Sequence, residues 1–301
     1  MTGRRSRPSG VRIVIALGAA LLVLIALLRV LGPSPHRPIS GRRAAPPGGR
    51  HRIARLAPQT RTPPEQGKPT ASDSPRLIAV VIDDVGFDES MALDFARLGL
   101  PMTFAILPHQ RYSIALASRL REMGHEVILH LPMQPVGRPG SDPGEGAVTE
   151  GLSRDEIRAI VEGDLESVPG AVGLNNHMGS QATTDPILMR AVLEVTRERG
   201  LFFLDSRTTS ATVAYDLAVE MGIPAARRTV FLDDRRERSY IEAQVRSLLE
   251  RARMEGIALA IGHPDQATLD ALKESTGLLR SPDIRMVPVS TLAGAGGQGA
   301  G

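Results

Sequence analysis

Short apolar segments that end in an acid, an amide or a histidine recur along this chain. They lie at residues 80–84, 127–130, 172–177, 201–205 and 259–263. Apolar runs of this length are typical of strands buried on both faces, as in parallel sheets. In an α/β barrel the carboxyl ends of such strands meet at one face, and that face carries the active site. The pattern therefore predicts an enzyme built on parallel strands.

From Arg76 onward, the apolar runs alternate with amphipathic stretches. We expect strands near residues 77–83, 102–107, 126–131, 171–175, 201–205, 228–232, 257–262 and 285–289. Three helices between them carry clear end signals. They are Arg154–Ser167 after a Ser153/Glu156 capping box, 186–199 after Asp185 with Pro186 in its first turn, and 240–255 before Gly256. About eight β/α units favour a single distorted (β/α) barrel, with an open doubly wound sheet as the alternative.

The first turn after a strand argues against the open sheet. Asp84-Val-Gly-Phe87 has neither the glycine fingerprint of dinucleotide sites nor the Gly-Lys-Ser/Thr of phosphate loops. Further along, the Gly- and Pro-rich segment 136–151 is expected to form a long loop over the strand ends, where enzymes of this kind place substrate contacts.

The charge of the chain is unevenly distributed. Residues 1–76 carry 14 Lys and Arg against 2 Asp and Glu, a net +12, whereas residues 77–301 carry 22 against 31, a net −9. Because binding to phosphates needs a basic face, the acidic folded part argues against nucleic acid as a partner. The chain has no cysteine, which excludes disulfides and thiolate metal ligands and is compatible with an oxidising compartment.

A basic segment precedes a long apolar stretch at the N-terminus. Residues 11–31 would form roughly 31 Å of helix, enough to cross a bilayer. The positive-inside rule predicts a cytoplasmic segment at 1–12, a single-pass anchor in the inner membrane at 13–31, and a remainder that faces the periplasm or the exterior. A cleaved signal peptide is the alternative, but Leu31-Gly-Pro-Ser-Pro35 lacks an obvious small-x-small cleavage site.

The segment after the anchor is rich in proline and arginine. Residues 33–75 hold ten of the 23 prolines of the chain and almost no periodic apolar pattern, so they cannot bury enough surface to fold. We therefore expect a disordered linker at 32–75, a barrel domain at 76–292 and a Gly/Ala-rich tail at 293–301.

Asp83 and Asp84 end the first predicted strand. Neighbouring residues of a strand point to opposite faces, so both carboxylates can serve one site only if the chain turns there, which Gly86 permits. A pair of acids after a fully apolar run then suits one metal ligand and one proton acceptor. The alternative is that one of the two caps the next helix.

Histidines and asparagines follow the next strands. His130 lies at a carboxyl end, where a neutral imidazole is a natural metal ligand, whereas His125 begins the same strand and suits a structural hydrogen bond. Asn175, Asn176 and His177 share one turn. We expect His177 to be a further metal ligand and the two asparagines to contact substrate, with an asparagine-stabilised turn as the alternative.

Later strand ends offer further polar groups. Asp205 and the pair Asp233 and Asp234 could each cap a following helix, and Asp205 is the better catalytic candidate because it follows a wholly apolar run. His263 is presented at a strand end and suits a general acid. His109 also follows a strand, where it is either a substrate contact or a surface residue.

Five motifs, in this order, resemble the divergent polysaccharide deacetylase family. They are Ile82-Asp-Asp-Val-Gly86, Gly124-His-Glu-Val-Ile-Leu-His-Leu-Pro-Met133, Gly173-Leu-Asn-Asn-His-Met-Gly-Ser180, Phe203-Leu-Asp-Ser-Arg-Thr208 and Ile261-Gly-His-Pro264. The resemblance covers about residues 77–290. It implies a distorted (β/α) barrel of the polysaccharide deacetylase type and metal-dependent removal of N- or O-acetyl groups from carbohydrate.

The resemblance also implies a role for each residue that matches a motif. Asp83 would be the general base and Asp84 a metal ligand, while His130 matches the first histidine of the metal motif of the superfamily. His263 resembles the histidine of the fifth motif. Asp205 resembles the aspartate of the fourth motif but lacks the tryptophan that usually follows it.

One departure from the superfamily pattern concerns the metal. The second histidine of the His-x-x-x-His motif falls on Gln134, a poor zinc ligand. His177 would then complete a set with Asp84 and His130, leaving positions open for water and substrate, and Zn²⁺ is the divalent metal expected of such ligands. With three tyrosines and no tryptophan, the chain has few residues for stacking on sugars.

Together these features predict a metal-dependent hydrolase that removes acetyl groups from an envelope polysaccharide or a peptidoglycan-like glycan. The alternative is a non-catalytic envelope protein that keeps the barrel as a glycan-binding or scaffolding module. Gln134 favours the alternative. Asp83 together with His263 favours the enzyme, because binding alone needs neither a base nor an acid.

Overall fold

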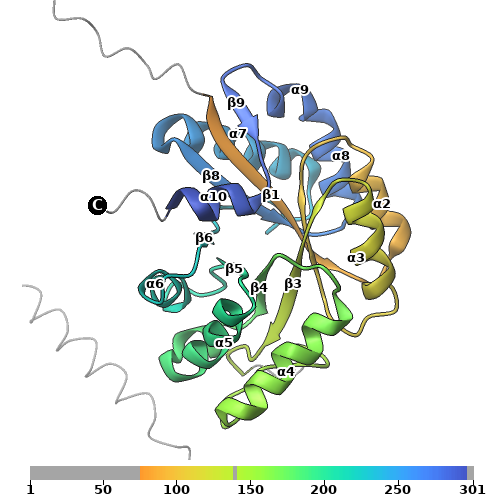
Figure 1. The fold of residues 1–301 in the computed structure, drawn as a ribbon. Helices are drawn as coiled ribbons and strands as arrows, with labels where there is room; N and C mark the ends of the chain where they lie inside the picture. The colour runs from red at the N-terminus through yellow and green to blue at the C-terminus, as the bar shows by residue number, and fades with distance from the viewer. Residues whose placement is uncertain (1–74, 138–140, 297–301) are drawn as a thin grey trace, which may run out of the picture. The chain divides into compact units, whose positions relative to one another are not determined.

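The computed structural model describes residues 75–137 and 141–296. In this part the strands form one parallel sheet that curls, and most of the helices pack around its outer side (Figure 1). From edge to edge the order is β6-β5-β4-β3-β2-β1-β8-β7, and β9 pairs with the start of β1. The strands are β1 (Arg76–Val85), β2 (Thr103–Ile106), β3 (Glu126–Met133), β4 (Gly173–Met178), β5 (Phe202–Asp205), β6 (Ala225–Arg227), β7 (Val230–Phe231), β8 (Ile257–Gly262) and β9 (Ile284–Met286).

The two edge strands of the sheet are consecutive in the sequence. β6 pairs with β5, β7 pairs with β8, and only Arg228 and Thr229 lie between them. The sheet therefore curls until its edges meet in one segment, which is consistent with the predicted barrel and not with an open doubly wound sheet. Within the strand predicted at 228–232, only Val230–Phe231 forms a strand, and a further short strand that was not predicted, β6, precedes it. The pairing partner changes between the two strands.

Helices connect most of the successive strands, and all three helices with clear end signals are confirmed. α4 begins with the Ser153/Glu156 capping box, α5 begins after Asp185, and α7 ends before Gly256, whose φ is 89°. The helices are α2 (Glu89–Ala96), α3 (Ser113–Glu122), α4 (Arg154–Ser167), α5 (Pro186–Glu198), α6 (Ala214–Glu220), α7 (Arg238–Glu255), α8 (Gln266–Glu274), α9 (Thr276–Leu279) and α10 (Val289–Gly296).

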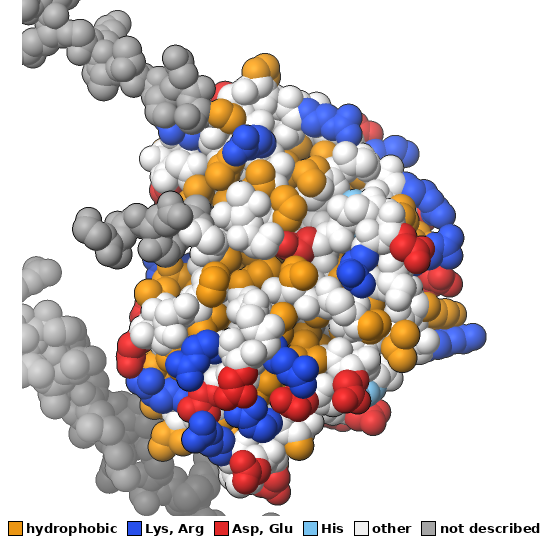
Figure 2. All heavy atoms as spheres, in the orientation of Figure 1, with side chains coloured by type: hydrophobic (Ala, Val, Ile, Leu, Met, Phe, Trp, Pro, Cys, Tyr) orange, Lys and Arg blue, Asp and Glu red, His pale blue; other side chains and the backbone are white. Residues whose placement is uncertain are grey.

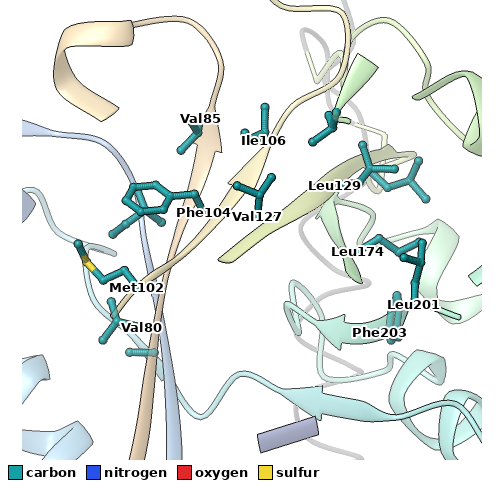
Figure 3. Close-up of a cluster of buried hydrophobic side chains, with 14 of the residues drawn as sticks. Val80, Val85, Met102, Phe104, Ile106, Val127, Leu129, Leu174, Leu201 and Phe203 are labelled. Atoms are coloured by element: carbon teal, nitrogen blue, oxygen red, sulfur yellow. The ribbon is translucent and has the colours of Figure 1, made fainter. Parts of the chain in front are cut away.

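The larger hydrophobic core lies between the sheet and the outer helices. Figure 3 shows part of it, with Val80 of β1, Phe104 of β2, Leu129 of β3 and Phe203 of β5 among the labelled side chains. Because consecutive strand residues point to opposite faces, the alternate residues of the same strands form a second core on the inner face of the sheet. That inner core contains Val81, Ala105, Ile128 and Leu204.

α10 packs against the inner core at the amino ends of the strands. Its Val289 N donates to Thr103 Oγ1 at the start of β2, and Ser290 N donates to Glu126 Oε1 at the start of β3, both at 3.1 Å. Leu292 is buried in the same core. α10 therefore covers one end of the curled sheet and leaves the carboxyl ends of the strands at the other.

Ion pairs connect the exposed faces of α4 and α5. Arg154 Nε lies 2.6 Å from Glu194 Oε2, and Arg158 Nη1 lies 2.5 Å from Glu198 Oε2. Figure 2 shows acidic and basic side chains mixed over this part of the surface. Exposed pairs of this kind contribute little to stability, about 0–1 kcal/mol each, so the buried apolar faces of the two helices account for their packing.

The predicted cytoplasmic segment 1–12 and anchor 13–31, with residues 32–74 of the predicted linker, lie outside the described residues. Within 75–137 and 141–296, no helix combines the length and the hydropathy needed to span a bilayer. At the other end, the expected boundary of the tail at residue 293 differs from the structure, because α10 continues to Gly296 and Ala293 is buried.

Candidate active site

The backbone turns at Asp84, where β1 ends. Asp84 has a left-handed φ of 54°, and the pairing register between β1 and β2 shifts at this point. Such a bulge redirects consecutive side chains. Both carboxylates consequently lie near His130, with Asp84 Oδ1 at 3.1 Å and Asp83 Oδ2 at 3.6 Å from its Nε2. The chain therefore turns as it must for both carboxylates to serve one site. The turn begins at Asp84, two residues before Gly86.

The three residues predicted as metal ligands converge. His130 lies on β3 and His177 on the neighbouring strand β4. His177 Nδ1 lies 2.9 Å from Asp84 Oδ1 and 3.2 Å from His130 Nε2. One potential ligand atom from each residue lies within 4.8 Å of the other two. Three strands thus bring a carboxylate and two imidazoles to one point, and His130 lies within β3, which continues to Met133.

Asn175 fixes the orientation of His130. Its Oδ1 lies 2.8 Å from His130 Nδ1, and because an amide oxygen only accepts, Nδ1 carries the proton. In the neutral ring, the lone pair of Nε2 then faces Asp84 and His177, as a ligand to metal requires. The Asn175 amide nitrogen donates to Asp83 Oδ1 at 2.9 Å. Asn175 is fully buried, so it positions these groups and cannot be the substrate contact that we expected.

The environment of Asp84 fits a cation. Its Oδ1 is buried and makes no hydrogen bond of normal geometry to any described residue, although two imidazole nitrogens face it. Burial favours a higher pKa for Asp84, but His130 and His177 outweigh it and hold that pKa well below its usual range. Carboxylate oxygen and imidazole nitrogen are the usual zinc ligands in a cysteine-free site. These residues therefore fit a divalent metal ion.

The electrostatics of His130 lead to the same conclusion. Burial favours a lower pKa for His130, but the charges of Asp83 and Asp84 and the hydrogen bond from its ring to Asn175 raise the pKa above its ordinary value. The pair of carboxylates thus stabilises a positive charge at this point. A proton on the imidazole or a metal ion beside it can supply that charge.

Asp83 is buried next to the three ligands. Burial raises its pKa above the ordinary value, and the charges of His130 and His263 oppose this only in part. A carboxylate with a raised pKa is a stronger proton acceptor than an exposed one. Asp83 therefore suits a general base, because it lies beside the metal ligands and its pKa is raised.

His263 follows β8 and approaches the cluster with its ring. Its Nε2 lies 3.8 Å from Asp84 Oδ2, while its Nδ1 lies 2.9 Å from Asp233 Oδ1. Burial favours a lower pKa for His263, but the hydrogen bond to Asp233 and the negative charges of Asp233, Asp83 and Asp84 raise the pKa to about 9. The ring is therefore protonated at neutral pH, as a general acid must be.

Asp205 and Asp233 have the reverse of their expected roles. Asp205 Oδ1 accepts from Arg207 N at 2.8 Å and its Oδ2 accepts from Thr212 Oγ1 at 2.9 Å, so both oxygens hold the loop after β5. We therefore assign Asp205 to this loop and not to catalysis. Asp233, in contrast, contacts the ring of His263. Its place at the site could have been predicted from the sequence, because residues 230–232 form an apolar run directly before this acid.

Asn176 and His109 were also predicted to contact substrate, and both have partners within the protein. Asn176 Oδ1 accepts from Ser206 N at 2.9 Å, and the buried side chain shapes the wall of the site. His109 Nε2 lies 2.7 Å from Asp164 Oδ1 of α4. Burial raises the pKa of Asp164 to about 7 despite His109. His109 thus belongs to a separate hydrogen-bonded pair with Asp164 and does not join the three ligands.

Gln134 supports the loop after β3. Its Oε1 accepts from Glu150 N at 2.6 Å, and its backbone N donates to Val148 O at 2.9 Å. The loop expected at 136–151 is thereby held at the carboxyl ends of the strands. Gln134 is not among the residues that could hold the metal, and His177 from the next strand completes the set instead.

Two clefts open beside the cluster. One, of about 410 Å³, is lined by Asp83, His130, His177 and His263, and its remaining wall includes Ser206, Arg207, Arg228, Phe231 and Asp234. The other, of about 250 Å³, shares His263 and is lined by Asp84, Phe87 and Arg236. Phe87 is 62% exposed, an unusual position for a phenylalanine. An extended molecule could therefore lie across His263 with Asp84 beneath it.

Comparison with known sequences decides the family. The sequence model of divergent polysaccharide deacetylases matches residues 80–293. The chain belongs to this family. An uncharacterized protein of Haemophilus influenzae is 37% identical to this chain over 218 residues, which are 71% of this chain and 76% of the Haemophilus protein. The uncharacterized protein YibQ of Escherichia coli is 34% identical over 215 residues, which are 71% of this chain and 66% of YibQ.

A solved structure shares the fold of this member of the divergent polysaccharide deacetylase family. The crystal structure of the uncharacterized protein ATU2773 from Agrobacterium tumefaciens matches with a TM-score of 0.69 and 21% identity, covering 72% of this chain and 89% of that one. At this identity the similarity concerns the fold. The match to the family model confirms the expected family, and the curled parallel sheet with its helices is consistent with the expected deacetylase-type barrel.

Proposed function

We propose that the protein is a metal-dependent hydrolase that removes acetyl groups from an envelope polysaccharide. One observation carries the proposal: Asp84, His130 and His177 form a set of metal ligands with Asp83 on one flank and His263 on another. Membership in the divergent polysaccharide deacetylase family supports the same reaction class. When bound there, a divalent cation, in our proposal Zn²⁺, would polarise the acetyl carbonyl and lower the pKa of water.

The residues of the chain would divide the proton transfers between them. Asp83 would accept a proton from the attacking water as its oxygen bonds to the carbonyl carbon. His263 would donate its proton to the nitrogen or oxygen that leaves when the bond to the acetyl carbon breaks. Acetate and a free amine or hydroxyl are then the products. Asp233 would keep the imidazole of His263 oriented and charged through its hydrogen bond at 2.9 Å.

A glycan substrate is supported by the shape of the surface. The two clefts share His263, and exposed Phe87 lines one of them. The face of an aromatic ring packs well against the apolar face of a sugar. We infer that one sugar rests near Phe87 while the acetylated sugar lies over Asp84 and His263.

The alternative is a non-catalytic glycan-binding or scaffolding protein on the same barrel. It is favoured by the use of Gln134 for loop support where the superfamily motif has a metal-binding histidine. It does not account for a buried base beside a hydrogen-bonded imidazole, because binding a neutral glycan requires neither.

We further propose that residues 13–31 anchor the protein in the inner membrane and that the barrel faces the periplasm. The arginines in 1–12 and the apolar stretch after them support this topology. A reporter that is active only outside the cytoplasm, fused after Leu292, tests the proposal. Activity of a cytoplasmic reporter at the same position would contradict it.

Acetate release tests the enzymatic proposal. The full-length chain is purified, loaded with Zn²⁺ and incubated with acetylated fragments of chitin, peptidoglycan and exopolysaccharides. We expect acetate release that a chelator abolishes and added metal restores. Release that is unaffected by the chelator would contradict metal dependence, and no release from any fragment would favour the scaffold.

A further inference from the structure

Arg207 and Arg228 lie side by side on the wall of the larger cleft. Both line it together with Asp83, His130 and His263. Arg228 Nη2 donates to the backbone oxygen of Arg207 at 2.8 Å, so the two residues are tied to each other. Two positive charges therefore border the space that the reacting group of the substrate would occupy.

The guanidinium of Arg228 is held in a fixed orientation. Its Nε donates to Ser206 O at 2.7 Å, and its Cζ lies over the ring of Phe231, 4.8 Å from the ring centroid. Burial and the nearby charge of Arg207 lower the pKa of Arg228 from its ordinary value. Holding this positive charge here therefore carries a cost in folding free energy, and an anion bound in the cleft would offset it.

Arg207 contributes to the loop after β5 through its backbone and not through its side chain. Its backbone adopts a left-handed φ of 49°, stabilised by the hydrogen bond from its N to Asp205 Oδ1. Its side chain is exposed and makes no hydrogen bond to any residue that the structure describes. The strained backbone thus places a free guanidinium at the cleft.

Neither arginine is paired directly with a carboxylate of the described residues, although the charges of Asp83, Asp205 and Asp234 partly oppose the lowering of the Arg228 pKa. No described carboxylate lies within 4 Å of either guanidinium, and this includes Asp234, which lines the same cleft. Guanidinium groups bind planar carboxylates through paired hydrogen bonds, and two of them side by side fit one such group.

We propose that Arg207 and Arg228 form a subsite for a carboxylate on a sugar next to the acetylated one. The natural substrate is then an acidic glycan, with either a hexuronic acid or a lactyl ether beside the acetylated residue. This inference rests on the proposed deacetylase function, because that function is what identifies the neighbouring sugar as acetylated. The recognition of the carboxylate can be measured without turnover.

Binding is tested with a matched pair of oligosaccharides. The full-length chain carrying Asp83→Asn, which keeps the substrate intact, is titrated by calorimetry with an alternating N-acetylglucosamine and glucuronic acid oligosaccharide. Its carboxyl-reduced form is the neutral control. We expect the acidic oligosaccharide to bind at least about tenfold more tightly, with a difference that shrinks as salt is added.

Substitutions assign the difference to the subsite. Arg207→Gln should reduce the affinity for the acidic oligosaccharide by about ten- to a hundredfold and leave the neutral one unchanged. Arg228→Gln should act in the same direction, and its melting temperature shows whether the loop has stayed folded. Arg227→Gln is the control, because Arg227 is next in sequence but lies over Tyr215, outside this cleft.

The outcomes separate the subsite from the catalytic proposal. Equal affinity for the acidic and neutral oligosaccharides, or no binding of either at millimolar concentration, overturns the subsite. Tighter binding of a phosphorylated oligosaccharide than of either carboxylate also overturns it. A disaccharide with N-acetylmuramic acid distinguishes a lactyl carboxylate from a uronate. If the acidic oligosaccharide binds selectively but wild-type protein releases acetate from no substrate, the subsite stands and the hydrolase proposal fails.

Discussion

The carboxylate of Asp233 holds His263 at two points. Asp233 Oδ2 accepts from the backbone N of His263 at 2.6 Å, and its Oδ1 lies 2.9 Å from the ring Nδ1. Oδ2 also accepts from Thr268 Oγ1 at 2.9 Å, so the carboxylate itself cannot rotate. The ring is thereby fixed with Nε2 toward the cluster, and its positive charge is stabilised. The pH dependence of the reaction should report this pair.

Asp233→Asn should shift the alkaline limb of the pH profile. In the wild type, kcat/KM should fall at high pH as His263 loses its proton, near its raised pKa of about 9. Without the charge of Asp233, that limb should move toward the ordinary histidine value of about 6.5. Asp216→Asn makes the same charge change on the exposed surface of α6 and should leave the profile in place. An unmoved limb in Asp233→Asn would mean that another group is the acid.

His177→Ala should sharply reduce metal content. We expect the purified wild type to carry about one divalent ion per chain, and removal of one of three protein ligands to weaken its binding strongly. His125→Ala is the matched control, because His125 Nε2 lies 3.1 Å from Ala96 O and its ring packs edge-on against Phe104, away from the ligands. Elemental analysis of the folded proteins gives the comparison. Equal metal content in wild type and His177→Ala would remove His177 from the ligand set.

Gly146→Ala should destabilise the loop after β3 more than Gly144→Ala. Both glycines have left-handed φ values, 77° and 96°, so each alanine introduces backbone strain of about 1–2 kcal/mol. Only at Gly146 would the added Cβ collide with the Asp164 carboxylate, whereas the space at Gly144 is open. We expect a melting temperature several degrees lower for Gly146→Ala. Asp164→Ala in the same chain should remove most of that difference, and equal melting temperatures of the two single variants would argue against the contact.

Much of the fold was predictable because its strands are buried on both faces. Uniform apolar runs such as 80–82 and 127–129 carry that signal locally, and the helix caps at Ser153 and Asp185 mark the helices between them. The change of partner at Arg228 was not predictable, because strand pairing is decided by long-range contacts. The end of α10 was not predictable either, because residues 293–296 are alanines and glycines with no apolar periodicity, and Ala293 is buried only through tertiary packing.

The convergence of Asp84, His130 and His177 was predictable for a geometric reason. Parallel strands place their carboxyl ends together, so residues that end such strands meet. Apolar runs precede both Asp205 and Asp233, so the local sequence marks both as candidates, and the choice between them depended on strand order, which the sequence does not reveal. Asp233 follows β7, which pairs with β8 and so adjoins His263, whereas Asp205 is the last residue of β5, which pairs with β4 and β6.

Asp83→Asn should separate the enzyme from the scaffold. The substitution is nearly isosteric, and Asn at this position can still accept the hydrogen bond from Asn175 Nδ2. Because burial raises the pKa of Asp83, an uncharged side chain removes a cost of burying charge, and the melting temperature should not fall. Metal content should stay close to that of the wild type.

Turnover in Asp83→Asn should nevertheless fall by about 10² to 10⁴, the usual contribution of a general base. Acetate release measured on the same metal-loaded preparations gives the ratio. In a strain lacking the chromosomal copy, the variant should fail to restore the wild-type phenotype if hydrolysis is the biological role. Full complementation by Asp83→Asn, at normal protein levels, would make binding without chemistry the better account of this barrel.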